Sequence, residues 1–455
     1  MNGLLQSLAS FVVALGILVT IHEFGHFWVA RRLGIKILRF SVGFGRPLWG
    51  RRFGSDSTEF VVAAIPLGGY VKMLDEREGE VPAQEVDRAF NRQSLATRTA
   101  VVTAGPLFNF LFAILAYWLM FVIGISGLKP IIDEVAPDSI ADRAGLEAGY
   151  QILAVDQRST PTWGAAVQGI VGKIVAGEPV VLTVRDNAQS EHELVIDLQS
   201  VGVDDVTGGN LLQRLGITPF RPELPPVIGK IIPGSAAQRA GLEPHDRIMA
   251  ADGQGIESWS EWVKYVQARP NETIRTEVMR AEHLVTVELR PEPFGEGDKV
   301  IGRIGAVVYQ PEDADPSYLS VEKYSPPVAL AKALSKTWEV SVLTLKLLGK
   351  MLMGQASFEN LSGPISIAQY AGQSASIGIV AFVGFLAIVS VSLGVLNLLP
   401  IPILDGGHLL YYFIELISRR PVSETVQLIG QQVGIIILVV LMIVAFYNDI
   451  VRIFS

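Results

Sequence analysis

Residues 4–30 decide the fold of this chain, and they read LLQSLASFVVALGILVTIHEFGHFWVA. The stretch contains no Lys, Arg or Asp, and Glu23 is its only acid. A run of this length can cross a bilayer as a helix, because spanning needs about 20 apolar residues. A secretory signal peptide is disfavoured, since no positive charge precedes the run and no A-x-A-like site ends it. We therefore expect a transmembrane helix here.

An HExxH motif, His22-Glu23-Phe24-Gly25-His26, lies inside this apolar run. Residues four apart share a helix face, so both imidazoles can bind one metal while Glu23 lies beside them. The motif also occurs by chance in unrelated helices. However, ionisable groups in a membrane helix are costly and usually functional. The location therefore favours a membrane-embedded zinc hydrolase.

Three further apolar runs predict additional membrane spans. They cover residues 99–125, 377–404 and 433–447, and the last is short unless it begins at Val426. Residues 326–354 are also rich in apolar side chains, but they carry four lysines at helical spacings. This pattern favours amphipathic helices at the membrane surface over a fifth span. We expect four spans.

The distribution of charge predicts the orientation. Residues 31–98 hold 12 Lys and Arg against 8 Asp and Glu, whereas residues 129–378 hold 22 against 32. Because basic loops face the cytoplasm, we expect the first loop inside and the large acidic loop outside. Both termini would then lie outside, with the HExxH box near the cytoplasmic end of its helix. The net charge of −8 gives no reason to expect nucleic-acid binding.

The external segment contains a tandem repeat with a constant offset of 96 residues. Residues 130–163 and 226–259 match at 14 of 34 positions, including a shared RAGLE run. Each copy continues into a helix-like stretch and then a strand-like one, at residues 180–184 and 274–279. A solenoid would require three or more copies, so two independent domains are favoured. The absence of cysteine excludes disulfides, and each domain must rely on its own core.

Both copies resemble PDZ domains of the bacterial, circularly permuted kind, which bind an extended peptide as an added strand. The resemblance rests on the pattern V.P.S.A..AGL..GD.I...DG. The first copy has Tyr150 where an acid is usual, and the second has His245 where glycine is usual. These departures put peptide binding in doubt, and two structural spacers are the alternative.

A third zinc ligand must come from outside the HExxH box, because a catalytic site uses three protein ligands and an open position. The best candidate is Asp405, in the segment NLLPIPILDGGH that ends the third predicted span. Pro400 and Pro402 break the helix just before it. His408 is a rival ligand. We prefer Asp405, because His408 could also simply pack in the loop.

The two motifs together resemble those of the site-2 protease family. HExxH in a first span, NxxPxxxxDG at the end of a later one and PDZ units between them are its pattern, and the likeness covers essentially the whole chain. The segments 104–109 (AGPLFN) and 362–366 (SGPIS) also look like parts of that family. The resemblance implies Zn²⁺ bound by His22, His26 and Asp405, with Glu23 as general base.

The resemblance also implies substrate contacts and a biological setting. Asn397 and Pro400 would contact substrate, as would the loop of Gly43, Phe44 and Gly45, which is similar to the family's GFG loop. The substrates would be single-span membrane proteins, among them an anti-sigma factor already trimmed outside, and remnant signal peptides. The protein would be a monomer in the lipid of a bacterial inner membrane. The active site would face the cytoplasm and the PDZ pair the periplasm.

Residues 58–73 predict a β-hairpin, with two β-like runs joined at residues 66–69. Its apolarity suggests a hairpin dipping toward the membrane, although a plain cytosolic hairpin is the alternative. A helical substrate must be unwound before cleavage, and an added strand could hold it open.

The predicted fold is an α-helical membrane protein with four transmembrane spans, a membrane-associated β-hairpin and two tandem external PDZ-like α+β domains. Two other functions compete with the protease: a membrane PDZ scaffold with a vestigial zinc site, and a zinc transporter. Glu23 argues against the scaffold, and a single ligand cluster argues against the transporter. The predicted segments are helix 1 (1–33), the β region (34–97), helix 2 (98–126), the PDZ-like domains (127–222 and 223–310), the amphipathic region (311–375), helix 3 (376–408) and helix 4 (426–451).

Overall fold

The computed structural model describes residues 2–202, 205, 210–294, 300–309, 318–354, 357 and 362–454. The chain forms two compact units. The membrane unit comprises Met1–Gly127, Val135–Ile217 and Val321–Ser455, and the second unit comprises Leu128–Glu134 and Thr218–Ser320.

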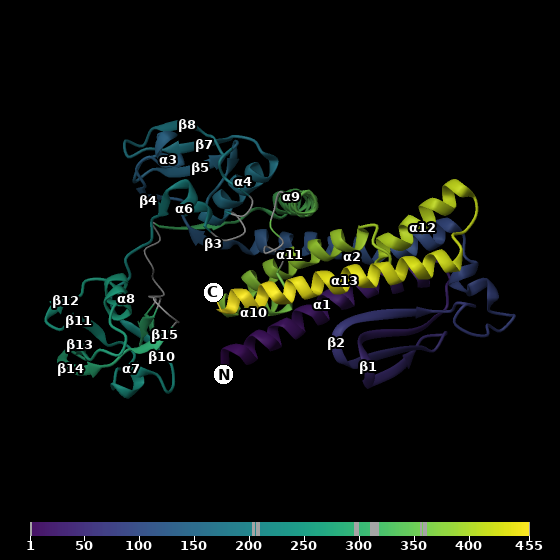
Figure 1. Ribbon diagram of the computed structural model, residues 1–455, viewed down its shortest axis with the longest axis horizontal. Helices are drawn as coiled ribbons and strands as arrows, with labels where there is room; N and C mark the ends of the chain where they lie inside the picture. Colours follow the sequence, from purple (N-terminus) through teal and green to yellow (C-terminus); the bar gives the residue numbers. More distant parts are fainter. Residues whose placement is uncertain are drawn as a thin grey trace. The chain divides into compact units, whose positions relative to one another are not determined.

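Four helices in the described part of the chain are long and apolar enough to cross a membrane, which confirms the predicted number. They are α1 (Asn2–Arg32), α2 (Leu95–Ile123), α11 (Ile379–Leu398) and α13 (Glu424–Phe454). In Figure 1 the two chain ends lie at one end of these helices, and the β1–β2 sheet and α12 lie toward the other. The fourth helix is thus longer than residues 433–447. The third ends at Leu398, two residues before Pro400, where proline cannot continue a helix.

Helix α2 packs against both α1 and α11. Its approach to α1 is close because a Cβ on Gly25 would lie 2.4 Å from the backbone oxygen of Ala104. On the other side, a Cβ on Gly394 of α11 would lie 3.0 Å from the Phe110 ring. Glycine at these two crossings therefore lets the three helices approach closely, as small residues do in membrane bundles.

Strands β1 (Ile37–Phe53) and β2 (Thr58–Met73) form one antiparallel sheet in the membrane unit. The chain reverses at residues 54–57, where Phe53 pairs with Thr58. Residues 66–69 join the two predicted runs, but the runs do not pair with each other as a hairpin would, because the first part of β1 lies between them. Both β-like runs of β2 pair with the same part of β1, since Ser41 faces both Val61 and Tyr70. This double pairing requires β1, which the alternation within residues 58–73 alone could not reveal.

Helix α9 (Pro326–Leu352) is a single helix and is not among the candidate spans. Its small residues Ala329 and Ala333 are buried against Tyr117 and Phe121 of α2. The indole Nε1 of Trp118 donates to the Pro326 carbonyl at 2.9 Å. The amphipathic stretch therefore packs on the bundle through a narrow alanine face.

Helix α10 (Pro364–Ile377) packs against both the first helix, α1, and the last helix, α13. Asp449 of α13 is 1% exposed and accepts hydrogen bonds from the backbone amides of Gly363, Ile365 and Ser366 and from the Ser366 hydroxyl. A carboxylate at a helix N-terminus is favoured by the free amides there. The segment 362–366 thus anchors α13.

The two repeats have the same strand order. The first forms the sheet β6-β5-β7-β8 and the second β12-β11-β13-β14. The helix between the second and third strands of each copy begins at a tryptophan, in α4 (Trp163–Ala176) and α8 (Trp259–Gln267). The strands predicted at residues 180–184 and 274–279 correspond to β7 (Val180–Arg185) and β13 (Ile274–Arg280). His245 has φ +71°, like Gly149 at +85° in the first copy, so it occupies a position that favours glycine.

The remaining elements complete the two repeats and the connections around them. They are η1 (Val86–Arg88), η2 (Phe90–Arg92), β3 (Ile125–Leu128), β4 (Ile132–Val135), α3 (Ile140–Arg143), β5 (Gln151–Val155), β6 (Arg158–Ser159), β8 (Glu191–Ile196), α6 (Leu211–Leu215), β9 (Ile217–Pro219), β10 (Ile228–Ile231), α7 (Ala236–Arg239), β11 (Arg247–Ala251), β12 (Gln254–Gly255), β14 (His283–Leu289), β15 (Glu292–Phe294), β16 (Ile301–Arg303), β17 (Ala306–Val308), β18 (Leu319–Glu322) and α12 (Asp405–Ser418).

Candidate metal centre

Two imidazoles and one carboxylate converge inside the membrane unit. His22 and His26 lie one turn apart on α1, and Asp405 is the first residue of α12. Oδ2 of Asp405 lies 3.2 Å from Nε2 of His22 and 3.5 Å from Nε2 of His26, and the two nitrogens are 3.3 Å apart. In the described residues these three form the one cluster able to hold a metal ion.

The three separations fit a zinc ion. Zinc bound at 2.0–2.2 Å by tetrahedral ligands holds its ligand atoms roughly 3.3–3.6 Å apart. Moreover, Oδ2 of Asp405 is buried and accepts no hydrogen bond from the described residues. An ionised oxygen without a hydrogen bond is costly in a buried site, unless it binds a cation. The donor atoms and their spacing therefore suit zinc.

Asp405 reaches this position because the chain bends sharply after α11. Ile403 has φ +99°, a strained value for a β-branched residue. A Cβ on Gly406 would lie 2.1 Å from the Leu399 oxygen, and one on Gly407 would lie 2.5 Å from the Ile401 oxygen. Glycines at these two positions allow the chain to fold back on itself. Such strain is commonly found at functional sites.

A second contact holds α12 further along its length. The Arg98 guanidinium forms a two-pronged ion pair with Glu415, at 2.6 and 3.2 Å, and lies 5.0 Å from the centre of the Tyr412 ring. Both charged side chains are only 18% exposed. This bidentate geometry fixes α12 against the start of α2.

Helix α2 packs directly against both imidazole rings. A Cβ on Gly105 would lie 2.3 Å from Nε2 of His26 and 2.8 Å from Cε1 of His22. The ring nitrogen Nδ1 of His26 lies 2.9 Å from the Val101 carbonyl oxygen. Metal-binding histidines usually donate their second ring N–H to such an acceptor, which fixes the ring orientation.

The β-sheet reaches Glu23 from the other side. A Cβ on Gly69 would lie 3.0 Å from Cγ of Glu23 and 2.9 Å from Cγ1 of Val19. Strand β2 therefore lies beside Glu23, the residue that the sequence predicts to be the general base.

The remaining predicted site residues lie on neighbouring elements. Gly43 and Gly45 have φ values of +93° and +87° within β1, and the Phe44 ring between them is 43% exposed and stacks on Tyr70. Asn397 lies in the last turn of α11, and Pro400 is exposed in the bend. No described contact joins any of these five residues to the histidine–aspartate cluster.

His408, the rival ligand, is outside the cluster. The centre of its ring lies 6.3 Å from the centre of the Tyr411 ring, and desolvation lowers the pKa of its imidazole.

The sequence analysis did not single out Gly105, Val101 and Gly69, whose backbone lies close to the histidines or to Glu23. Only the AGPLFN segment gave a signal for α2, through its likeness to the site-2 protease family.

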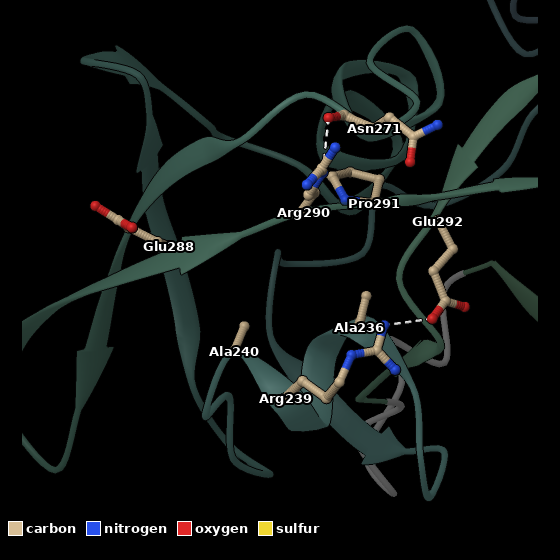
Figure 2. A pocket seen from close by; sticks show the side chains of 8 residues that line it. All are labelled: Ala236, Arg239, Ala240, Asn271, Glu288, Arg290, Pro291 and Glu292. Carbon is tan, nitrogen blue, oxygen red and sulfur yellow. Dashed lines mark hydrogen bonds and ion pairs between the residues drawn. The ribbon is translucent and has the colours of Figure 1, made fainter.

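A separate pocket of about 480 Å³ lies in the second unit (Figure 2). Three of the four charged side chains that line it have partners within the chain: Arg239 pairs with Glu292, and Arg290 donates to the Asn271 carbonyl oxygen at 2.9 Å. Both arginines are thus engaged without a ligand. The cluster able to hold a metal ion in the described residues lies instead in the membrane unit.

Comparison with known proteins gives a family for the whole chain. The model of peptidase family M50 matches residues 10–441. The "Regulator of sigma-E protease RseP" of Escherichia coli K12 is 43% identical over 455 residues, covering 99% of this chain and 100% of the relative. A Vibrio cholerae protein named "Putative zinc metalloprotease" is 44% identical over the same shares. A Haemophilus influenzae protein named "Regulator of sigma E protease" is 40% identical, covering 98% of this chain and 99% of the relative. The chain thus belongs to peptidase family M50, as an intramembrane zinc metalloprotease of the site-2 type.

Proposed function

We propose that His22, His26 and Asp405 hold the catalytic zinc and that Glu23 is the general base of a protease cutting within transmembrane segments. The observation that carries this assignment is the separation of the three ligand atoms, 3.2–3.5 Å. These values match the edges of a zinc tetrahedron and leave one position open.

When bound, zinc lowers the pKa of a coordinated water to about 7 and polarises the scissile carbonyl. Glu23 then takes a proton from the attacking water on its carboxylate and passes it to the departing amine. The Val101 carbonyl keeps the His26 ring in one orientation.

The substrate must be unwound before its carbonyl can react, because a helix hides its carbonyls in its own hydrogen bonds. We propose that Asn397 and Pro400 contact the unwound segment, together with Gly43, Phe44 and Gly45. The position of β2 beside Glu23 supports this role for the sheet.

The substrate class is a single-span membrane protein. The relatives' names refer to sigma-E regulation, so an anti-sigma factor is the first substrate to test. We further propose that the repeats are PDZ-like domains, at residues 127–222 and 223–310, which filter substrates on the periplasmic side. The enzyme would be a monomer in the inner membrane, with its active site toward the cytoplasm, as the charge distribution predicts.

A reconstitution experiment tests the proposal. The purified chain in detergent or lipid should contain about one zinc per molecule and cleave a model single-span substrate. Chelation should abolish cleavage, and added zinc should restore it. A chain that binds peptide through its repeats, with or without zinc, but never cleaves would instead support the PDZ scaffold with a vestigial site.

A further inference from the structure

The fully buried side chain of Asn109 faces His22 from α2. Its Nδ2 atom lies 3.1 Å from Nδ1 of His22, and the residue is 0% exposed. Its other amide atom, Oδ1, is buried and has no partner among the described residues. We infer that Asn109 is a positioning residue whose Oδ1 accepts a hydrogen bond from Nδ1–H of His22, so that Nε2 is presented to the metal. This inference rests on the zinc site proposed above.

The protonation of His22 decides which amide atom must face it. A histidine that binds metal through Nε2 carries its proton on Nδ1, which is then a donor and needs an acceptor. The amide nitrogen of Asn109 is itself a donor, so two donors would face each other. The oxygen and nitrogen of an amide have nearly the same shape, and the hydrogen-bond network decides their placement. Whichever way the Asn109 amide is turned, one of its two atoms faces His22 and the other has no partner among the described residues. The Nδ1–H donor of His22 therefore decides that Oδ1 is the atom that faces it.

The other histidine shows the same arrangement. Nδ1 of His26 lies 2.9 Å from the Val101 carbonyl oxygen, which can act only as a hydrogen-bond acceptor. Asn109 and Val101 lie on the same helix, two turns apart, and each faces the Nδ1 atom of one imidazole. Helix α2 therefore supplies both acceptors. Only the one for His22 is a side chain, and only that one can be removed by substitution.

The backbone around Asn109 is firmly placed. The Ser390 hydroxyl of α11 donates to the Asn109 carbonyl at 2.8 Å, and Ser390 is 0% exposed. One turn earlier, Gly105 brings α2 against both imidazole rings. The amide is thus held between α1 and α11 with little freedom to move. This rigidity is what the orientation of a metal ligand requires.

The test measures zinc affinity of the full chain in detergent by competition with a chromophoric chelator. Asn109→Leu removes the acceptor and should weaken zinc binding about 10–100-fold, the usual effect of losing such a partner. Asn109→Asp keeps an acceptor and should stay within about tenfold of the wild type. Ser392→Ala is the control, because it removes a serine hydroxyl of α11 that bonds only to the Ile388 carbonyl of its own helix, at 3.1 Å, and its zinc affinity should be unchanged.

The outcomes separate this inference from the proposed function. Wild-type zinc affinity in folded Asn109→Leu would overturn it, and so would an equal loss in the aspartate and leucine variants. If the leucine variant does not insert, Asn109→Ala removes the amide without adding volume and decides the question. His22→Ala must itself lose zinc. If it does not, the metal site has been wrongly assigned, whereas zinc loss in His22→Ala alone rejects only the role of Asn109.

Discussion

A Cβ atom on Gly105 would lie 2.3 Å from Nε2 of His26, inside the contact distance of any two atoms. Helix α2 therefore approaches the two imidazoles so closely that only a glycine at position 105 leaves room for their rings. The metal site depends on a residue that contributes no side chain, and this dependence can be tested.

We predict that Gly105→Ala loses zinc and nearly all proteolysis, because its methyl group must displace the imidazole that binds the metal. Overpacking of this kind typically costs about 1–3 kcal/mol of stability. Gly16→Ala in α1 is the control, since its Cβ would meet no atom within 4 Å. Zinc content per chain and cleavage of a single-span substrate measure the effect. Normal zinc in folded Gly105→Ala would contradict the packing seen here.

The role of Glu23 can be separated from metal binding. Glu23→Gln keeps the size of the side chain but cannot accept a proton at neutral pH. We expect unchanged zinc content and a loss of cleavage of about 10²–10⁴-fold, the usual contribution of a general base. Single-turnover cleavage and zinc analysis on the same sample make the comparison. Full activity in this variant would refute the assigned mechanism.

The third ligand is tested by comparing two residues of α12. Asp405→Ala should lose both zinc and activity, because two histidines leave the site incomplete. His408→Ala should retain zinc, since the ring of His408 packs on Tyr411 outside the cluster. Metal analysis of the two purified variants distinguishes them. Retention of zinc by Asp405→Ala together with its loss in His408→Ala would show that the wrong ligand was chosen.

The repeats can be removed at a natural junction. The Lys129 amide donates to the Tyr318 carbonyl oxygen at 2.9 Å, so residues 130–317 can be deleted with little displacement of the remaining ends. A shorter deletion ending at Leu289 would leave β16 and β17, although β17 pairs with β10 of the second repeat.

We expect the deletion to preserve cleavage of a short single-span substrate and to extend cleavage to substrates with bulky external domains. The reason is that the proposed orientation puts the repeats on the periplasmic side and the zinc site toward the cytoplasm, so the repeats would exclude large substrates without touching the scissile bond. Cleavage of both substrates in membranes is the measurement. Loss of the short-substrate activity in a deletion variant that still inserts would show recruitment instead of filtering.

The sequence alone predicted the features that depend on local pattern. Four apolar runs gave four helices of spanning length, since span length follows from the thickness of the hydrocarbon core. The spacing of His22 and His26 placed both on one helix face, because helical neighbours lie four residues apart. The repeat at an offset of 96 gave two sheets with the same strand order.

The tertiary structure decided what depends on contacts between distant segments. Nothing in the local pattern of residues 58–73 placed the first part of β1 between the two runs of β2. The sequence offered both Asp405 and His408 as ligands, and the bend at Ile403, Gly406 and Gly407 brings only Asp405 to the histidines. Gly105 and Asn109 likewise reach the two imidazoles only because α2 crosses α1 at this point. A helix pattern fixes which residues share a face, but only packing fixes what that face meets.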